Sequence, residues 1–153
     1  MKKLLKIIFT IVFVLVVDLT TKHFLFNVEY FNLIPGVISI MGGVKNTGAA
    51  WGILGGNVAV LIVITAVMVA ALMLFNHFVK NKNTFYCLAF GFIIGGAIGN
   101  LIDRVVFQYV RDFIFLDFFP TFPVFNMADS FLCVGAVMLA IFILFMNKEK
   151  HEK

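Results

Sequence analysis

Long apolar stretches separated by shorter polar segments make up most of this chain of 153 residues. Three stretches cover residues 58–75, 85–102 and 127–146, and a fourth covers residues 4–26. Each is close to the roughly 20 residues that an α-helix needs to cross a bilayer core of about 30 Å. The pattern therefore predicts an all-α membrane protein with four transmembrane helices, folded as a single integral membrane domain over residues 1–153.

The first apolar stretch has two interpretations. It starts with the basic sequence KKLLK and a short apolar run, as a secretory signal peptide does, but no small-residue cleavage site follows that run. Its later part carries Asp18 and Lys22, whose i and i+4 spacing allows an ion pair on one helical face. We therefore expect an uncleaved transmembrane helix, with a cleaved signal peptide as the alternative.

Composition narrows the class of protein. The chain is 62% hydrophobic and 13% charged, whereas soluble domains are roughly half apolar and a quarter charged. These values argue against a disordered chain and against a nucleic-acid partner, and two cysteines are too few for a disulfide scaffold. Cys87 and Cys133 fall near opposite membrane faces, so we expect both to be unpaired, small core residues.

The distribution of charge predicts the orientation of the helices, because Lys and Arg are retained on the cytoplasmic side. With both termini in the cytoplasm, the basic residues on that side are Lys2, Lys3, Lys6, Lys80, Lys82, Lys148, Lys150 and Lys153. Those outside are Lys22, Lys45, Arg104 and Arg111. In this orientation most acids lie toward the outer side, namely Asp18, Glu29, Asp103, Asp112, Asp117 and Asp129.

The outer segment over residues 28–52 joins the first two helices. Its apolar runs flank Pro35-Gly36, a typical turn sequence, so it predicts a small extracytoplasmic β-hairpin or sheet, with an irregular apolar loop as the alternative. Trp51 is expected near the membrane interface, where amphipathic rings collect. The segment ends in a small-residue loop in which Asn46 precedes Gly48, and this glycine would let a backbone come close to an extended peptide.

Polar residues recur at the outer ends of the third and fourth helices. Gly91, Gly95 and Gly99 form a ridge on which another helix can pack closely. Beyond the ridge, Asn100 and Asp103 share one helical face.

Two further segments carry acids at the same membrane face. Residues 110–114 form a short extended run that contains Asp112. Asn126 is placed to cap the fourth helix, which puts Asp129 at the third helical position, where an acid is favoured electrostatically.

The remaining side chains do not indicate metal or nucleophilic chemistry. The three histidines lie in different regions without metal-ligand spacing, and no G-x-S-x-G turn is present. Acids and amides of the outer face remain, and the residues alone do not rank Asp112 above Asp103. They leave open a protease, a small cation transporter or channel subunit with an outer acidic site, and a structural scaffold.

Five sequence blocks in this order resemble the lipoprotein signal peptidases, or signal peptidase II. The blocks are residues 18–22, 46–51, 95–104, 110–113 and 126–129. The resemblance implies a membrane aspartyl endopeptidase of the bacterial cytoplasmic membrane, with its active site on the extracytoplasmic side. Its substrates would be prolipoproteins bearing a diacylglyceryl cysteine.

The same resemblance implies which residues act. The catalytic pair would be Asp112 and Asp129, working with water and without metal or cofactor. We expect a monomer in contact with membrane lipids. Supporting or substrate-binding roles are expected for Asp18, Lys22, Asn46, Gly48, Asn100, Asp103, Arg104 and Asn126.

Overall fold

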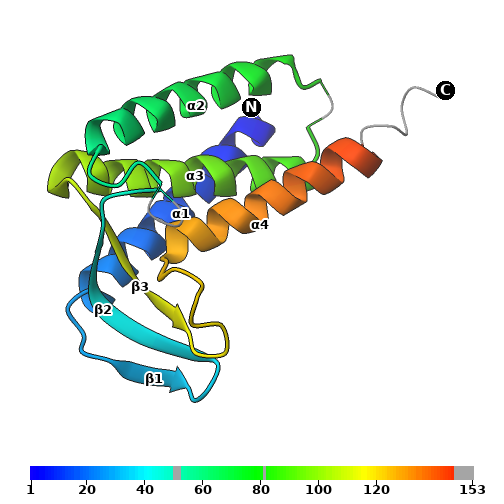
Figure 1. Ribbon diagram of the computed structural model, residues 1–153. Coiled ribbons are helices and arrows are strands. Elements are labelled where there is room, and N and C mark those ends of the chain that lie inside the picture. The colour runs from blue at the N-terminus through cyan, green and yellow to red at the C-terminus, as the bar shows by residue number, and fades with distance from the viewer. Residues whose placement is uncertain (50–52, 81, 147–153) are drawn as a thin grey trace.

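The computed structural model describes residues 1–49, 53–80 and 82–146. Within them, four helices are long and apolar enough to cross a membrane (Figure 1). They are α1 (Lys2–Leu25), α2 (Val58–Phe78), α3 (Thr84–Phe107) and α4 (Met127–Ile141), and α4 continues into a π-helical turn over Phe142–Met146. The four predicted helices are confirmed. The third extends beyond the predicted residue 102 because its polar last turns remain helical.

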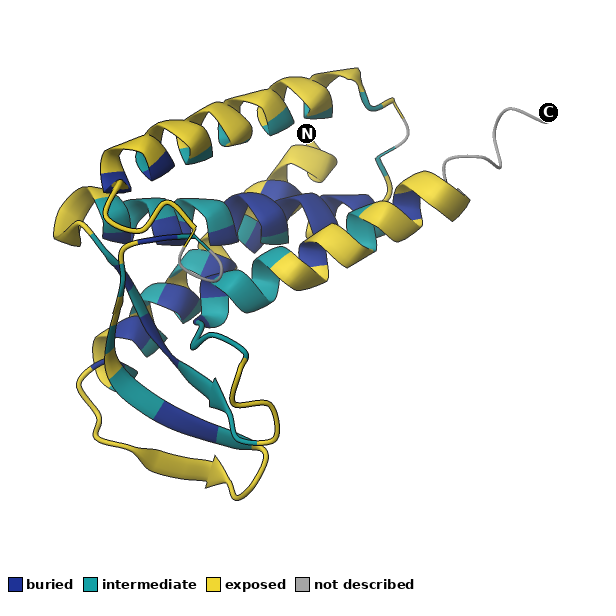
Figure 2. Ribbon diagram, viewed as in Figure 1, coloured by how far each residue is buried: buried dark blue, intermediate teal, exposed yellow. Residues whose placement is uncertain are grey.

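Helix α3 lies at the centre of the bundle. Of the 18 most apolar consecutive residues of α3, 61% are buried, whereas the corresponding share for α2 is 11%. Helix α2 therefore packs on α3 more loosely. Most other helical surface is exposed and apolar (Figure 2). Such a surface fits a helix bundle surrounded by lipid, because lipid tails cover apolar side chains without a free-energy penalty.

The glycine ridge of α3 receives α1. A Cβ atom on Gly91 would lie 2.5 Å from Cβ of Thr10, and one on Gly95 would lie 2.7 Å from Cβ of Val14. One turn further, a Cβ on Gly99 would lie 2.5 Å from a carboxylate oxygen of Asp18. The predicted close helix contact is thus made within the chain, and it brings Asp18 to the outer end of α3.

The cysteines are free, as predicted, but their surroundings differ. Cys87 is fully buried in a core cluster at the end of the bundle where α3 begins, together with Tyr86, Phe90 and Phe142. Cys133 is exposed on α4, so its expected place in the core was wrong. The position lies on a face of α4 that is directed toward a pocket described below.

A three-stranded antiparallel sheet covers the end of the bundle where α1 ends and α4 begins. Strands β1 (Phe31–Ile34) and β2 (Ile38–Asn46) form the predicted hairpin, and Gly36 adopts a φ of +72° in its turn. Strand β3 (Val110–Leu116) follows α3 and pairs with β2, giving the order β1-β2-β3. The prediction of a sheet between the first two helices only is wrong, because the third strand comes from a distant segment.

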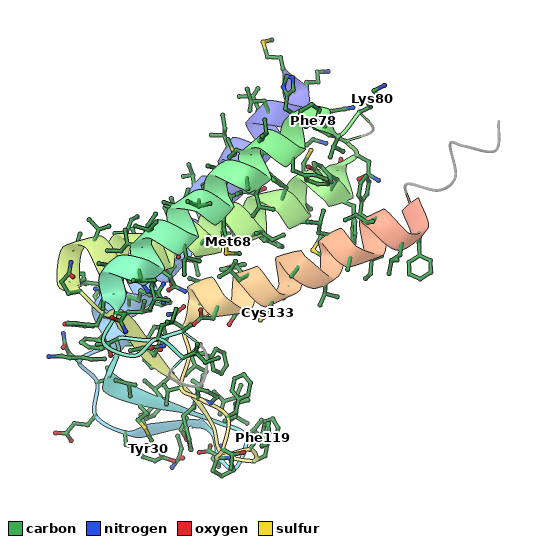
Figure 3. All side chains as sticks on the ribbon, turned by 45° about the horizontal axis from the view of Figure 1, so that its top comes forward. Tyr30, Met68, Phe78, Lys80, Phe119 and Cys133 are labelled. Atoms are coloured by element: carbon green, nitrogen blue, oxygen red, sulfur yellow. The ribbon has the colours of Figure 1, made fainter. Side chains whose placement is uncertain are left out.

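The two ends of the molecule differ in structure. Tyr30 and Phe119 lie at the sheet end, whereas Phe78 and Lys80 lie at the opposite end (Figure 3). Strand β2 ends at Asn46, so the predicted β segment over residues 28–52 is too long. Its last residues, including Trp51, and the basic C-terminal tail lie outside the described residues.

Candidate active site

Asp129 is held at the beginning of α4 by a reciprocal cap. The side-chain oxygen of Asn126 accepts a hydrogen bond of 3.0 Å from the backbone N–H of Asp129. In return, Oδ2 of Asp129 accepts one of 3.2 Å from the backbone N–H of Asn126. This capping box confirms the predicted cap and fixes Asp129 at the third helical position.

Asp112 reaches the same place from β3. Asp112 pairs with Val44 of β2. This pair lies between the pairs Lys45–Arg111 and Ile40–Ile114. The side chain of Asp112 is only 1% exposed. The sheet thus delivers a buried carboxyl group to the beginning of α4, although the two acids are far apart in the covalent chain.

Two buried amides connect the carboxylates. Nδ2 of Asn126 donates to Oδ1 of Asp112 at 2.7 Å and to Oδ1 of Asn100 at 3.1 Å. Nδ2 of Asn100 then donates to Oδ1 of Asp129 at 2.7 Å. Asp112 and Asp129 therefore belong to one hydrogen-bond network, as expected for acids that act together.

A third amide holds the other oxygen of Asp112. Nδ2 of Asn46 donates to Oδ2 of Asp112 at 2.9 Å, while Oδ1 of Asn46 accepts from the backbone N–H of Gly48 at 2.9 Å. The carbonyl oxygen of Gly48 in turn accepts from the guanidinium of Arg104 at 3.0 Å. The loop after β2 is thus tied to α3, and three of the predicted supporting residues lie beside the acids.

Asp103 has a different role from Asp112. Its carboxylate accepts from the backbone N–H of Arg111 at 3.0 Å and from the Arg111 guanidinium at 2.7 Å. Both interactions hold the strand residue that immediately precedes Asp112. The expected task of Asp103, which is to hold the segment that carries Asp112, stays a prediction that these contacts make specific.

The predicted ion pair on α1 is confirmed and extends across helices. Nζ of Lys22 lies 2.8 Å from Oδ2 of Asp18 and 3.4 Å from Oδ2 of Asp103, and all three side chains are fully buried. Lys22 also donates to Oδ1 of Asn100 at 2.9 Å. Because the Asn100 carbonyl faces Lys22 and Asn126, its amide nitrogen is directed at Asp129.

Asp18 adds a second contact to α4. Its Oδ1 accepts a hydrogen bond of 2.9 Å from the backbone N–H of Ala128. Sequence reasoning identified the Asp18–Lys22 pair but missed these contacts between helices. The sequence held one relevant signal. A charged side chain is costly to bury in a membrane, so Asp18 and Lys22 both need partners, but this cost does not indicate which residues the partners are.

The surroundings of Asp112 favour its protonated form. Burial, and then the negative charge of Asp129, raise the pKa of Asp112 from 3.8 to about 7, while the amides of Asn46 and Asn126 oppose the increase. A carboxyl group near neutrality can bind or release a proton at physiological pH, which is a property of acid–base catalysts.

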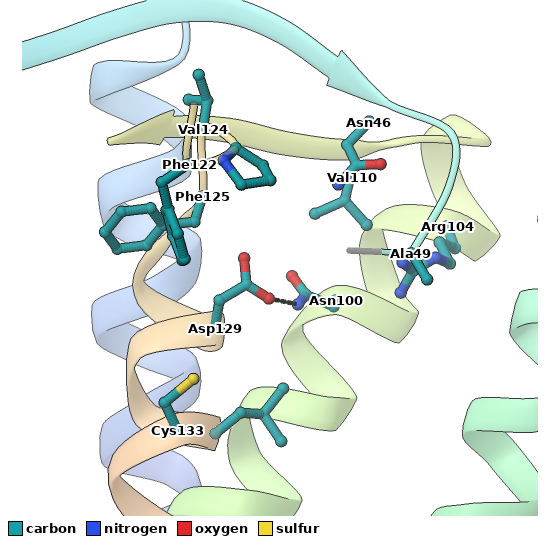
Figure 4. Close-up of a pocket in the computed structure, with 12 residues that line it drawn as sticks. Asn46, Ala49, Asn100, Arg104, Val110, Phe122, Val124, Phe125, Asp129 and Cys133 are labelled. Carbon is teal, nitrogen blue, oxygen red and sulfur yellow. Dashed lines mark hydrogen bonds between the residues drawn. The ribbon is translucent and has the colours of Figure 1, made fainter. Parts of the chain in front are cut away.

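A pocket of about 390 Å³ opens beside Asp129 (Figure 4). Its polar lining consists of Asn46, Asn100, Arg104 and Asp129. Its remaining lining is mainly apolar and includes Ala49, Val110, Phe122, Pro123, Val124, Phe125, Leu132 and Cys133. Sequence reasoning missed these apolar residues because they come from separate segments and no motif distinguishes them.

Only one of the two acids, Asp129, lines the pocket. Asp112 does not line the pocket and lies behind the amides of Asn46 and Asn126. Within the described residues, no three His, Cys, Asp or Glu side chains are grouped so that they could hold a metal ion. The arrangement is one accessible acid, one covered acid and several amide donors around a small cavity.

Comparison with known proteins identifies the family of this chain. Residues 10–145 match the family model described as signal peptidase (SPase) II. The chain belongs to the signal peptidase II family. The resemblance based on five sequence blocks is therefore confirmed, and the family is one of aspartic-type membrane peptidases.

Individual signal peptidases are similar over nearly the whole chain. The lipoprotein signal peptidases of Staphylococcus aureus strains MRSA252 and JH9 are 38% and 37% identical over 149 residues, which is 93% of this chain and 90% of each relative. Two solved structures described as a bacterial membrane enzyme are both 36% identical, with TM-scores of 0.83 and 0.81. The first comparison covers 96% of this chain and 92% of the other, and the second covers 91% and 92%.

Family membership gives the site its chemical class. A signal peptidase II is an endopeptidase, so the substrate of this chain is a peptide chain. Neither the transporter nor the scaffold interpretation accounts for the amide network that joins acids from a strand and a helix. The glycine ridge, which could have indicated an oligomer interface, is occupied by α1 of the same chain.

Proposed function

We propose that Asp112 and Asp129 are the catalytic dyad that hydrolyses the peptide bond before the diacylglyceryl-modified cysteine of a prolipoprotein. The amide network that links the two carboxylates beside the pocket is the observation that carries the proposal. It brings two acids from separate elements together in a partly dehydrated place. Two such groups cannot both ionise readily, so they share a proton.

The shared proton allows acid and base steps at one site. The ionised carboxylate takes a proton from a water molecule that attacks the scissile carbonyl, while the protonated carboxyl group polarises the carbonyl oxygen. As the tetrahedral intermediate collapses, a proton passes to the leaving amine and the C–N bond breaks. The chain supplies every group that this reaction requires, apart from the water and the peptide.

Peptide entry has to rearrange the resting site. The side chain of Asp112 is covered, and Asn46, which lines the pocket, donates to its Oδ2. Displacement of the Asn46 amide by substrate would expose that oxygen to the attacking water. The freed amide of Asn46 could then bind a backbone carbonyl of the extended peptide, together with the guanidinium of Arg104.

The depth of the dyad suits a substrate anchored in the bilayer. Asp129 begins a transmembrane helix, and β3 lies just beyond the end of another. We place both termini in the cytoplasm and the sheet outside. Of the Lys and Arg residues that the structure describes, the larger share lies at the end opposite the sheet, namely Lys2, Lys3, Lys6, Lys80 and Lys82. In that orientation, a monomer in the bacterial cytoplasmic membrane can cleave beside the lipid without extracting it.

The dyad is tested by replacing each acid in the purified, detergent-solubilised protein. Asp112→Asn and Asp129→Asn should each lower the rate of cleavage of a diacylglyceryl-modified prolipoprotein by at least about 10²–10⁴-fold, because general acid–base catalysis is lost. Asp117→Asn is the matched control, since this acid immediately follows β3 but accepts hydrogen bonds from Ser39 and Tyr30. Cleavage is followed by mass spectrometry, and folding by thermal unfolding.

The same assay with a chelator tests the chemistry. We expect equal rates with and without it, and cleavage immediately before the modified cysteine. Retained turnover in either dyad variant would contradict the assignment of the acids. Ion flux in proteoliposomes without cleavage would instead support a transporter.

A further inference from the structure

We infer that the apolar end of the pocket, at Leu132 and Cys133, holds an acyl chain of the lipid that the substrate carries, and that the size of residue 133 controls which chains fit. The inference rests on the proposed function, because it assigns part of the same pocket to the substrate's lipid. It concerns a pair of residues that neither the sequence blocks nor the dyad assignment includes.

The position of Cys133 follows from helix geometry. It comes four residues after Asp129, so it lies on the same face of α4 about 6 Å further along the helix. Both residues line the pocket, and Cys133 lies one turn below Asp129 in Figure 4. Cys133 is also exposed at the surface of a transmembrane helix. The pocket therefore extends from the acid toward the surface that faces lipid.

The end of the pocket at Leu132 and Cys133 lacks the polar side chains found in the rest of the pocket. Near Asp129, the amides of Asn46 and Asn100 and the guanidinium of Arg104 can hydrogen-bond with a peptide backbone, and apolar side chains of residues 110 and 122–125 line the same part. At the other end, Leu132 is apolar, and a thiol such as that of Cys133 is only a weak donor. The pocket is thus suited to a ligand that is polar at one end and apolar at the other.

The apolar end is unsuited to peptide backbone. Inside a bilayer, each backbone N–H and C=O without a partner costs several kcal/mol. An extended peptide that ran past Leu132 and Cys133 would leave such groups unpaired. An acyl chain has no donors, and its burial is favourable at about 0.8 kcal/mol per CH₂.

The covalent structure of the substrate fits the same direction. The lipid is attached through the sulfur of the cysteine that follows the scissile bond, so its acyl esters begin several bonds from the reacting carbonyl. With that carbonyl at Asp129, a chain directed along α4 would reach the level of Cys133 and continue into the bilayer. A volume of about 390 Å³ is near the lower limit for ligand sites, which are roughly 300–1,000 Å³. The pocket can therefore enclose only part of the lipid.

A bulky residue at this position tests the assignment. We compare two synthetic prolipopeptides, one whose glyceryl group carries two palmitoyl chains and one that carries two acetyl groups. Cys133→Trp should raise the KM for the palmitoyl substrate by about tenfold or more, the effect of losing burial for about two CH₂ groups. The KM for the acetyl substrate should change much less.

The neighbouring residue provides a matched control. Val134 is 51% exposed and does not line the pocket. Val134→Trp places the same bulk on the lipid-facing surface of α4 and should leave both KM values unchanged. Thermal unfolding of both variants shows whether either substitution disturbs the fold.

Thiol labelling gives an independent measurement. The sequence has only two cysteines, and Cys87 is fully buried. A maleimide should therefore modify Cys133 first, as mass spectrometry of the digested protein can show. In the non-cleaving Asp129→Asn variant, the palmitoyl substrate should slow this labelling, and the acetyl substrate should have a smaller effect.

The outcomes separate this inference from the proposed function. If Cys133→Trp weakens both substrates equally, or if the palmitoyl substrate does not slow labelling, the apolar end does not hold the acyl chain and the inference is overturned. The dyad assignment would survive either result. If the unaltered protein cleaves neither substrate while remaining folded, the proposed function and the inference fall together.

Discussion

The amide of Asn46 is one of the groups that affect the pKa of Asp112. It donates to Oδ2 of Asp112, and this hydrogen bond favours the ionised carboxylate. The pKa of Asp112 is nevertheless raised to about 7 by burial and by the charge of Asp129. Since part of this increase comes from the negative charge of Asp129, the two carboxyl groups titrate as a coupled pair.

The raised pKa predicts the alkaline limb of the pH profile of the substrate-free protein. If the singly protonated pair is active, kcat/KM should fall as pH rises through about 7. Asn46→Ala removes a donor that lowers the pKa of Asp112 in the free protein, so the limb should move to higher pH. Cleavage rates at substrate concentrations well below KM, measured over a range of pH, give the midpoint.

Asn32→Ala is the control for this substitution. Asn32 is an amide of the same sheet, but it accepts from Ser39 and Tyr30 and does not contact the dyad. The alkaline limb of the pH profile of the Asn32→Ala variant should coincide with that of the unaltered protein. A shift of the Asn46→Ala limb to lower pH would contradict the proposed electrostatics.

At the level of single elements, the beginning of α4 combines two tasks in one residue. The oxygen of Asn126 caps the helix, while its nitrogen donates to Asp112 and Asn100. Asn126→Ala should lose both the cap and the amide hydrogen bonds. The missing cap should lower the free energy of unfolding by about 1 kcal/mol. Asn126→Ser retains a capping oxygen, so it should be more stable than the alanine variant.

Cleavage rates should not follow that stability order. Serine cannot supply the two amide hydrogen bonds of Asn126, so both variants should lose activity. Thermal unfolding and cleavage of the lipidated substrate are measured on the same preparations. Activity of Asn126→Ser equal to that of the unaltered protein would show that the cap, and not the amide link, is what the dyad requires.

The packing of α1 against α3 predicts a second effect at the level of elements. Gly95→Ala would place its Cβ 2.7 Å from Cβ of Val14, so the helices have to move apart. Overpacking of this kind costs about 1–3 kcal/mol. The thermal midpoint should fall, and activity should fall with it, because α1 carries Lys22 and Asp18.

A compensating substitution tests whether contact is the cause. Val14→Gly in the Gly95→Ala background removes the opposing Cβ and should recover part of the lost stability. Ala136→Val, on an exposed face of α4, adds bulk without this contact and should have little effect. Absence of recovery in the double variant would mean that glycine is needed at position 95 for another reason.

At the scale of the whole molecule, the proposed orientation places the sheet and the dyad outside the cell. It is tested with single cysteines in a Cys133→Ser background. Glu29→Cys, beside the sheet, should react with a membrane-impermeant maleimide in intact cells. Lys80→Cys, at the opposite end, should react only after permeabilisation.

Both positions are exposed, so their labelling depends on the side of the membrane. Cys87 provides an internal unreactive thiol because it is fully buried. Labelling of Lys80→Cys alone in intact cells would reverse the proposed topology. It would also place the dyad in the cytoplasm.

The helices could be predicted because a bilayer imposes one requirement on every spanning segment. Apolar length is visible locally, and the backbone of a helix satisfies its own hydrogen bonds. The Asn126 cap and the Asp18–Lys22 pair were also local, within four residues. Strand β3 was not recognised as part of the sheet because its partner β2 is more than sixty residues away, and pairing at that distance leaves little local pattern.

By itself, the sequence determined the membrane class, the four helices and the order of the motif blocks, because these depend on composition and short spacing. Which acids share a site was decided only by the tertiary structure. Asp103 and Asp112 are nine positions apart and alike in type, but one is bound to Arg111 while the other faces the amides beside Asp129. The pocket likewise exists only once α3, α4 and the outer segments meet, because its walls come from side chains that have no relation to one another in the unfolded chain.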